Sequence, residues 1–188
     1  MTARLALALL LVLQVGLAQA DALRPSIEAV EASLRSAGPR ATLATHFNCA
    51  KYQGSAYEAI ASGSPQWIAL AERMLQHSDA CYTEGILGAL GQAMQKSPRQ
   101  VLPLVGKTTT LAAESICLPF ISDEIPVKAQ VAAVARSRNA IQGVRDEPLK
   151  AQREACLRFI GTVEAGIAAN QAARQAAPQA EAASAPRR

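Results

Sequence analysis

Residues 147–167 read EPLKAQREACLRFIGTVEAGI, and this stretch decides the fold class. Its apolar side chains recur at intervals of three and four residues, which places them on one face of an α-helix. The proline at its second position suits the first turn of a helix, because the backbone N–H groups there have no partner within the helix. The apolar face comprises Leu149, Cys156, Leu157, Ile160, Val163 and Ile167. The stretch therefore predicts a long amphipathic helix built around a cysteine.

The same periodicity recurs along the rest of the chain. Trp67, Leu70 and Met74 share one helical face, and the preceding Ser64-Pro65 supplies an N-cap and a first-turn proline. The sequence has no run of alternating β-branched residues and no Asn-Gly or Asp-Gly hairpin turn, so sheet is not expected. Helices are expected over residues 27–36, 56–61, 65–77, from 79, from 98, over 110–121 and 127–144, and from 147. Pro119 must bend or end the helix over 110–121. The fold class is therefore all-α, a compact array of antiparallel helical hairpins.

The first twenty residues predict a signal peptide. Arg4 gives a positive start, residues 5–17 are almost entirely apolar, and residues 18–20 read Ala-Gln-Ala, a small-x-small cleavage site. The apolar run is shorter than the roughly 18 residues that a membrane-spanning helix requires. We expect cleavage before Asp21 and a mature protein that is periplasmic or secreted, with no membrane span. The expected division is a signal peptide over 1–20, a helical domain over 21–170 and a disordered Ala/Pro/Gln-rich tail over 171–188, which lacks large apolar residues.

Four cysteines follow the leader, and an even number in an oxidising compartment predicts two disulfides. Three pairings are open. The intervals between consecutive cysteines, roughly 30 to 40 residues each, match a helical-hairpin repeat and favour bonds between neighbours. The preferred pairs are Cys49 with Cys81 and Cys117 with Cys156.

Two of the cysteines begin similar hexapeptides. Residues 117–122 read CLPFIS and residues 156–161 read CLRFIG, which agree at four positions. The agreement favours a HEAT-like repeat. Two unrelated helices that each bury one apolar stripe around a cysteine would give the same match, and both interpretations stay open.

Composition excludes one class of partner. The chain carries a net charge of +4 and only 18% charged residues, without the dense basic stripe that nucleic acid binding uses. No nucleic acid partner is expected. Aromatic residues make up 4% of the chain, so the core must consist of Ala, Leu, Ile and Val.

No catalytic signature and no cofactor site is predicted. Gly106-Lys107-Thr108 looks like the end of a phosphate-binding loop, but Val101 stands where that motif requires glycine. The adjacent carboxylates Asp123-Glu124 and Asp146-Glu147 fall at expected helix junctions, where capping and dipole compensation explain them. A non-enzymatic role is therefore favoured over an enzymatic one.

The two histidines offer an alternative. His46 precedes Cys49 by three residues and His77 precedes Cys81 by four, so each histidine could share a helical face with its cysteine. Two such pairs would suit a tetrahedral zinc or copper ion. Disulfides are the favoured use of these cysteines in an oxidising compartment. The alternative function is a periplasmic metal-binding or hydrolytic protein that uses His46 and His77.

The favoured function is a protein-interaction module that binds another periplasmic or envelope protein. In size, leader and two expected disulfides, the chain resembles the all-helical periplasmic immunity proteins that neutralise secreted cell-wall amidases. The resemblance implies an inhibitor or immunity-like role. No motif of that family is matched, so no binding residue follows from it, and the sites predicted are the structural cysteines alone.

Overall fold

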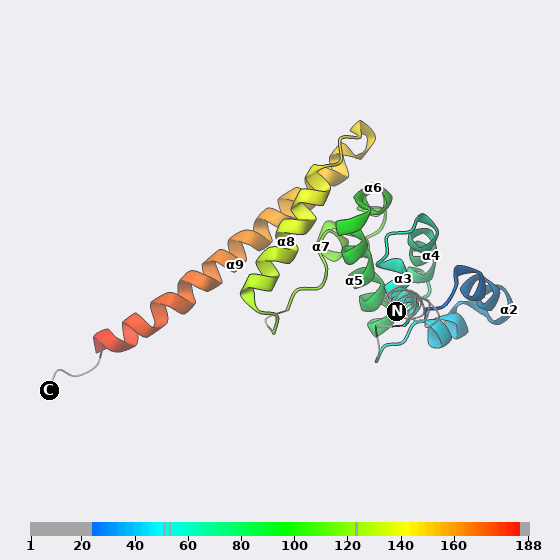
Figure 1. Ribbon diagram of the computed structural model, residues 1–188, viewed down its shortest axis with the longest axis horizontal. Helices are drawn as coiled ribbons and strands as arrows, with labels where there is room; N and C mark the ends of the chain where they lie inside the picture. The colour runs from blue at the N-terminus through cyan, green and yellow to red at the C-terminus, as the bar shows by residue number, and fades with distance from the viewer. Residues whose placement is uncertain (1–23, 51, 53, 123, 185–188) are drawn as a thin grey trace, which may run out of the picture. The chain divides into compact units, whose positions relative to one another are not determined.

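The computed structural model describes residues 24–50, 52, 54–122 and 124–184, and the expected signal peptide lies outside them. Within these ranges every regular element is a helix (Figure 1). The prediction of an all-α fold with two disulfides is confirmed. The hairpin array and the HEAT-like repeat stay predictions. No helix in the described part of the chain is long and apolar enough to cross a membrane.

The chain forms two compact units, the first ending at Leu90 and the second beginning at Gly91. The first unit contains α2 (Ile27–His46), α3 (Ala56–Ile60), α4 (Pro65–Leu75) and the greater part of α5 (Ala80–Lys96). Both α2 and α3 pack against α4. The fully buried large side chains of this unit are Phe47, Tyr57, Ile60, Leu70, Met74, Ile86 and Leu90.

Helix α2 is longer than the sequence predicted. It begins after Ser26, whose Oγ accepts a hydrogen bond from the Ala29 backbone N–H at 3.2 Å. The expected end near residue 36 is a kink, because Gly38 adopts φ 79° and the helix then resumes through Pro39. Glycine tolerates this positive φ, and proline fits the first turn of the resumed helix.

The second unit contains the end of α5 and six further helices. These are α6 (Pro98–Val101), the 3-10 helix η1 (Leu102–Leu104), α7 (Ala113–Ile116), α8 (Val127–Gln142), the 3-10 helix η2 (Glu147–Leu149) and α9 (Lys150–Ser184). Helices α8 and α9 lie side by side (Figure 1), and α7 and η1 also contact α9. The fully buried large side chains here are Met94, Leu102, Ile116, Ile141 and Ile160.

The helix expected over residues 110–121 is wrong in extent. Only the single turn of α7 is helical there, and residues 119–122 are irregular. Pro119 explains the difference, because its ring disfavours the helical conformation of Leu118 and removes one backbone donor. The chain leaves the helix at Cys117 and forms an irregular loop before α8.

The end of the chain also differs from the expected disordered tail. Helix α9 continues to Ser184 and so includes most of residues 171–188. Its side chains from 168 to 176 are exposed, so this stretch is helical without a buried face. Alanine has the highest intrinsic helix propensity and is abundant here, whereas the expectation of disorder considered only the lack of apolar residues to bury.

Candidate functional site

The structure pairs Cys49 with Cys81 and Cys117 with Cys156, the pairs that cysteine spacing favoured. The two Cα–Cα distances are 5.7 Å and 5.4 Å, within the range of ordinary disulfides. No cysteine is free. The four sulfur atoms are therefore not available as nucleophiles or as metal ligands.

The histidines do not form a metal centre in the part of the chain that the structure describes. His46 is the last residue of α2, and partial burial lowers the pKa of its imidazole. His77 lines an open depression of about 550 Å³, together with Arg40, Ser78 and Asp79. No group of three His, Cys, Asp or Glu side chains in the described ranges is placed to hold an ion. The alternative function through His46 and His77 gains no support from this geometry.

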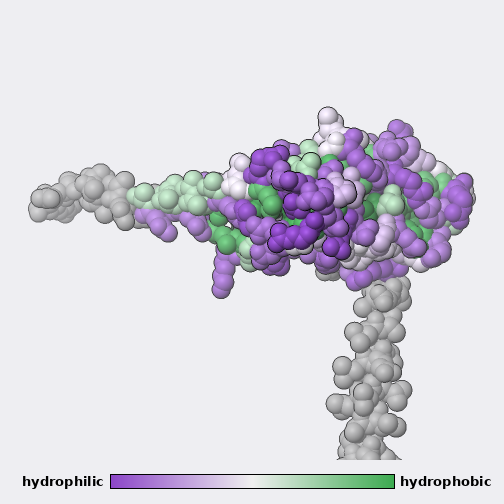
Figure 2. Space-filling view, turned by 90° about the horizontal axis from the view of Figure 1, so that it is seen from above, coloured by the Kyte–Doolittle hydropathy of each residue, from purple (hydrophilic) through white to green (hydrophobic). Residues whose placement is uncertain are grey.

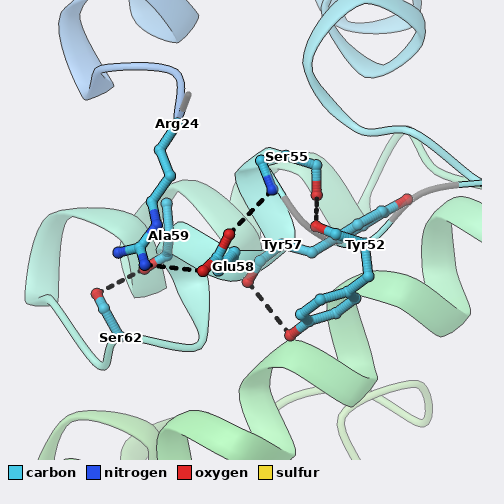
Figure 3. A network of polar contacts seen from close by, with 8 residues as sticks. Arg24, Tyr52, Ser55, Tyr57, Glu58, Ala59 and Ser62 are labelled. Atoms are coloured by element: carbon cyan, nitrogen blue, oxygen red, sulfur yellow. Dashed lines mark hydrogen bonds and ion pairs between the residues drawn. The ribbon is translucent and has the colours of Figure 1, made fainter. Parts of the chain in front are cut away.

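A polar network in the first unit ties the segment after Cys49 to α3 (Figure 3). The carboxylate of Glu58 accepts hydrogen bonds from Arg24 Nη2 at 2.7 Å and from the Gly54 backbone N–H at 2.9 Å. Ser55 Oγ donates to the Tyr52 carbonyl at 2.5 Å. These bonds join neighbouring backbone segments, so the network stabilises the local fold.

The aromatic side chains beside this network are also structural. The Tyr57 ring stacks on Tyr52 at a centroid distance of 5.7 Å and meets Phe47 edge-on at 5.3 Å. It fills the space above Gly85, where a Cβ atom would clash with it. Burial raises the pKa of Tyr57 to about 12, with a smaller contribution from Tyr82, and raises that of Tyr52 to about 12, with a smaller contribution from Glu58. Both phenols therefore remain neutral at physiological pH and supply no general base.

The second unit displays an exposed aromatic side chain. The exposed large hydrophobic residues among those described are Phe120, at 79% exposure, and Val131, at 46%. Phe120 lies in the irregular loop between α7 and α8, which comprises residues 117–122 and 124–126 and is called the Phe120 loop below. The ring therefore buries little area within the unit and is open to contact from outside it.

The beginning of the Phe120 loop is fixed by two contacts. The disulfide of Cys117 joins it to α9, and both cysteines of this bond are buried. One residue further on, the loop backbone lies directly on α5. A Cβ atom added at Gly91 would clash with the Leu118 carbonyl and lie 2.9 Å from Pro119 Cα. Glycine at this position allows the helix and the loop to approach backbone to backbone.

The end of the loop is fixed by a buried side chain of α8. Gln130 Nε2 donates to the Ser122 carbonyl at 3.1 Å and to the Ile125 carbonyl at 2.7 Å. The Ile125 N–H donates in turn to the Ser122 carbonyl at 3.1 Å, which closes a turn. Because both ends are fixed, the loop presents Phe120 from a preformed backbone.

An apolar groove lies in the same unit, between α8 and α9. It has a volume of about 220 Å³. Its lining consists of Val131, Val134, Ala135, Glu164, Ile167, Ala168 and Gln171. The α8–α9 groove is thus lined mainly by apolar side chains, and Figure 2 shows mildly hydrophobic surface along the exposed stretch of α9.

One charged group borders the α8–α9 groove, and its charge is neutralised. Arg138 Nε and Nη2 donate to the two carboxylate oxygens of Glu164 at 2.8 Å and 2.5 Å. The hydrogen bond to Glu164 raises the pKa of Arg138, so the guanidinium stays charged. The carboxylate is held by a planar, bidentate partner and does not present an unpaired charge to the groove.

Sequence reasoning identified residues 117–122 for their similarity to residues 156–161 and missed the exposed ring. The available signal was Pro119, which interrupts an apparent helix directly before an aromatic residue. The exposure of Phe120 depends on contacts with Gly91 and Gln130, which are distant in sequence.

The chain matches no protein-family model, and no curated protein or solved structure matches it.

Proposed function

We propose that the protein is a non-enzymatic protein-interaction module whose binding surface is the Phe120 loop. The observation that supports this most strongly is the 79% exposure of Phe120 on a loop whose two ends are fixed. Aromatic side chains dominate the binding energy of many protein interfaces because they bury a large area in a partner's pocket. A preformed loop loses little conformational entropy on binding, so more of that energy appears as affinity.

The partner on this proposal has an apolar pocket that accepts a phenyl ring. On one side of the ring, the Leu118 backbone packs against Gly91. Ser122 and Ile125 already accept hydrogen bonds from Gln130. On this proposal the ring itself is the principal contact.

The proposed setting is outside the cytoplasm, where the protein is soluble and binds another periplasmic or envelope protein in an inhibitor or immunity-like role. Two observations support it. Residues 1–20 have the composition of a signal peptide, and the two disulfides suit an oxidising compartment.

Site-specific photo-cross-linking in cells that express the protein tests the proposal. A benzophenone amino acid replaces Phe120 in one variant and Arg145, an exposed residue of the same unit, in the matched control. The proposal expects one heterologous protein to be cross-linked from position 120 and not from position 145. The captured protein must then bind the purified wild-type chain.

Affinity measurements complete this test. Phe120→Ala should weaken binding about 30-fold, which corresponds to about 2 kcal/mol for the loss of an aromatic hot spot. Arg145→Ala should leave the dissociation constant within about threefold. Equal cross-linking from both positions, or an unchanged affinity of Phe120→Ala, would refute the Phe120 loop as the binding surface.

A further inference from the structure

The second unit carries both an exposed ring and a groove of suitable size. We infer that two copies of this chain form a symmetric dimer in which Phe120 of each copy enters the α8–α9 groove of the other. This inference goes beyond the proposed function, because it concerns the protein without any heterologous partner. It rests on the groove as well as on the ring.

The volume and chemistry of the groove fit a phenyl ring. A buried apolar cavity of about 150 Å³ binds benzene in a well-studied engineered protein. The α8–α9 groove has a volume of about 220 Å³ and is lined by Val131, Ile167 and alanines. Val131 is 46% exposed, so the groove contains apolar surface that a ring would remove from water.

The charges around the groove do not oppose an aromatic guest. Glu164 is paired with Arg138 through two hydrogen bonds, and the other polar lining residue is the uncharged Gln171. The Glu164 carboxylate would therefore keep its partner when a ring is inserted. An unpaired charge in that position would have carried a desolvation penalty larger than the gain from one ring.

The positions of ring and groove suit two-fold symmetry. Phe120 lies in the loop directly before α8, and the groove begins at Val131 in the second turn of α8. Because the ring and the groove belong to the same unit, a two-fold axis would let each copy provide a ring and receive one, and such a dimer is closed.

The expected dimer is weak. Each aromatic side chain buries about 150–250 Å². Two rings therefore supply only part of the roughly 1,200 Å² at which stable interfaces begin. We expect a concentration-dependent equilibrium between monomer and dimer, in which a heterologous partner competes for Phe120.

Sedimentation velocity of the purified, oxidised protein tests this inference, with concentrations from about 1 µM to about 500 µM to span weak dissociation constants. The wild-type sedimentation coefficient should rise with concentration. Phe120→Ala, which lacks the ring, and Ala135→Glu, which places a charge in the groove, should each raise the dimer dissociation constant at least about tenfold. Lys128→Ala, at an exposed position of α8, should leave it unchanged.

Mixing the two defective variants is the most specific measurement. Phe120→Ala retains an intact groove and Ala135→Glu retains an intact ring, so an equimolar mixture should form heterodimers through one ring-in-groove contact. Both substituted residues are exposed, and an unchanged far-UV circular dichroism spectrum would show that the variants fold. A mixture that stays as monomeric as its components, or a wild-type protein monomeric throughout, would overturn the inference.

The dimer and the proposed function can fail separately. A monomeric wild-type protein refutes the dimer while leaving Phe120 available to a heterologous partner. Concentration-dependent dimerisation without heterologous cross-linking from position 120 supports the dimer and contradicts the proposed function.

Discussion

The substitution Gly91→Ala should destabilise the second unit, because the added methyl group meets the backbone of the Phe120 loop. A Cβ atom at residue 91 would clash with the Leu118 carbonyl and lie 2.9 Å from Pro119 Cα. These are backbone atoms, so no side-chain rotation can relieve the clash, and overpacking of this kind typically costs about 1–3 kcal/mol.

Gly166→Ala provides the matched control. Gly166 is also a helical glycine of the second unit, and a Cβ atom there would meet no atom within 4 Å. Both substitutions gain about 1 kcal/mol from the higher helix propensity of alanine, so this gain cancels when the two variants are compared. The difference in their free energies of unfolding should therefore be about 1–3 kcal/mol, with Gly91→Ala the less stable.

Urea denaturation followed by far-UV circular dichroism measures this difference. With a denaturant slope of about 2 kcal/mol/M, the midpoint of Gly91→Ala should lie about 0.5–1.5 M below that of Gly166→Ala. If Gly91→Ala were as stable as Gly166→Ala, the loop would not rest on α5 as described. Phe120 would then not be presented from a fixed backbone.

Three further outcomes follow from burial and hydrogen bonding. Gln130→Glu should destabilise the protein by about 1–3 kcal/mol in urea unfolding, since it replaces a donor to two carbonyls with an acceptor. Gln142→Glu, on the exposed face of α8, should change stability little. Equal effects of the two substitutions would contradict the hydrogen bonds assigned to Gln130. The disulfide of the first unit has exposed cysteines and should open under mild reductant before the buried disulfide of the second unit. Timed alkylation measures the order, and the reverse order would refute the described burial. Burial raises the pKa values of Tyr52 and Tyr57 to about 12, so the unfolded state releases these protons first and the free energy of unfolding should fall as pH rises from about 10 to about 12. Tyr52→Phe should reduce this dependence of the free energy of unfolding on pH. An unchanged dependence would argue against the burial of the Tyr52 phenol.

Much of the fold could be predicted from local sequence. Helical periodicity is a local property, so it located α4, α8 and the start of α9 to within a few residues. Cysteine spacing favoured the pairs that the structure contains, because hairpin-sized intervals bring neighbouring cysteines within reach. The extension of α2 beyond residue 36 was missed, because the helix resumes after a kink at Gly38 and Pro39.

The candidate site could not be predicted in the same way. The Phe120 loop depends on Gly91, Gln130 and Cys156, which contact it across long sequence separations. In the sequence Phe120 has the same apolar character as a core residue, and only its surroundings show that it is exposed. The α8–α9 groove likewise depends on which faces of two helices meet, which a single periodic pattern does not specify.

The central claim is that Phe120 binds a partner protein from a preformed loop. Isothermal titration of the cross-linked partner against wild-type protein, Phe120→Ala and Arg145→Ala tests it most directly. The account predicts a dissociation constant about 30-fold higher for Phe120→Ala, with Arg145→Ala within about threefold of wild type. A Phe120→Ala protein that binds its partner as tightly as the wild type would contradict it.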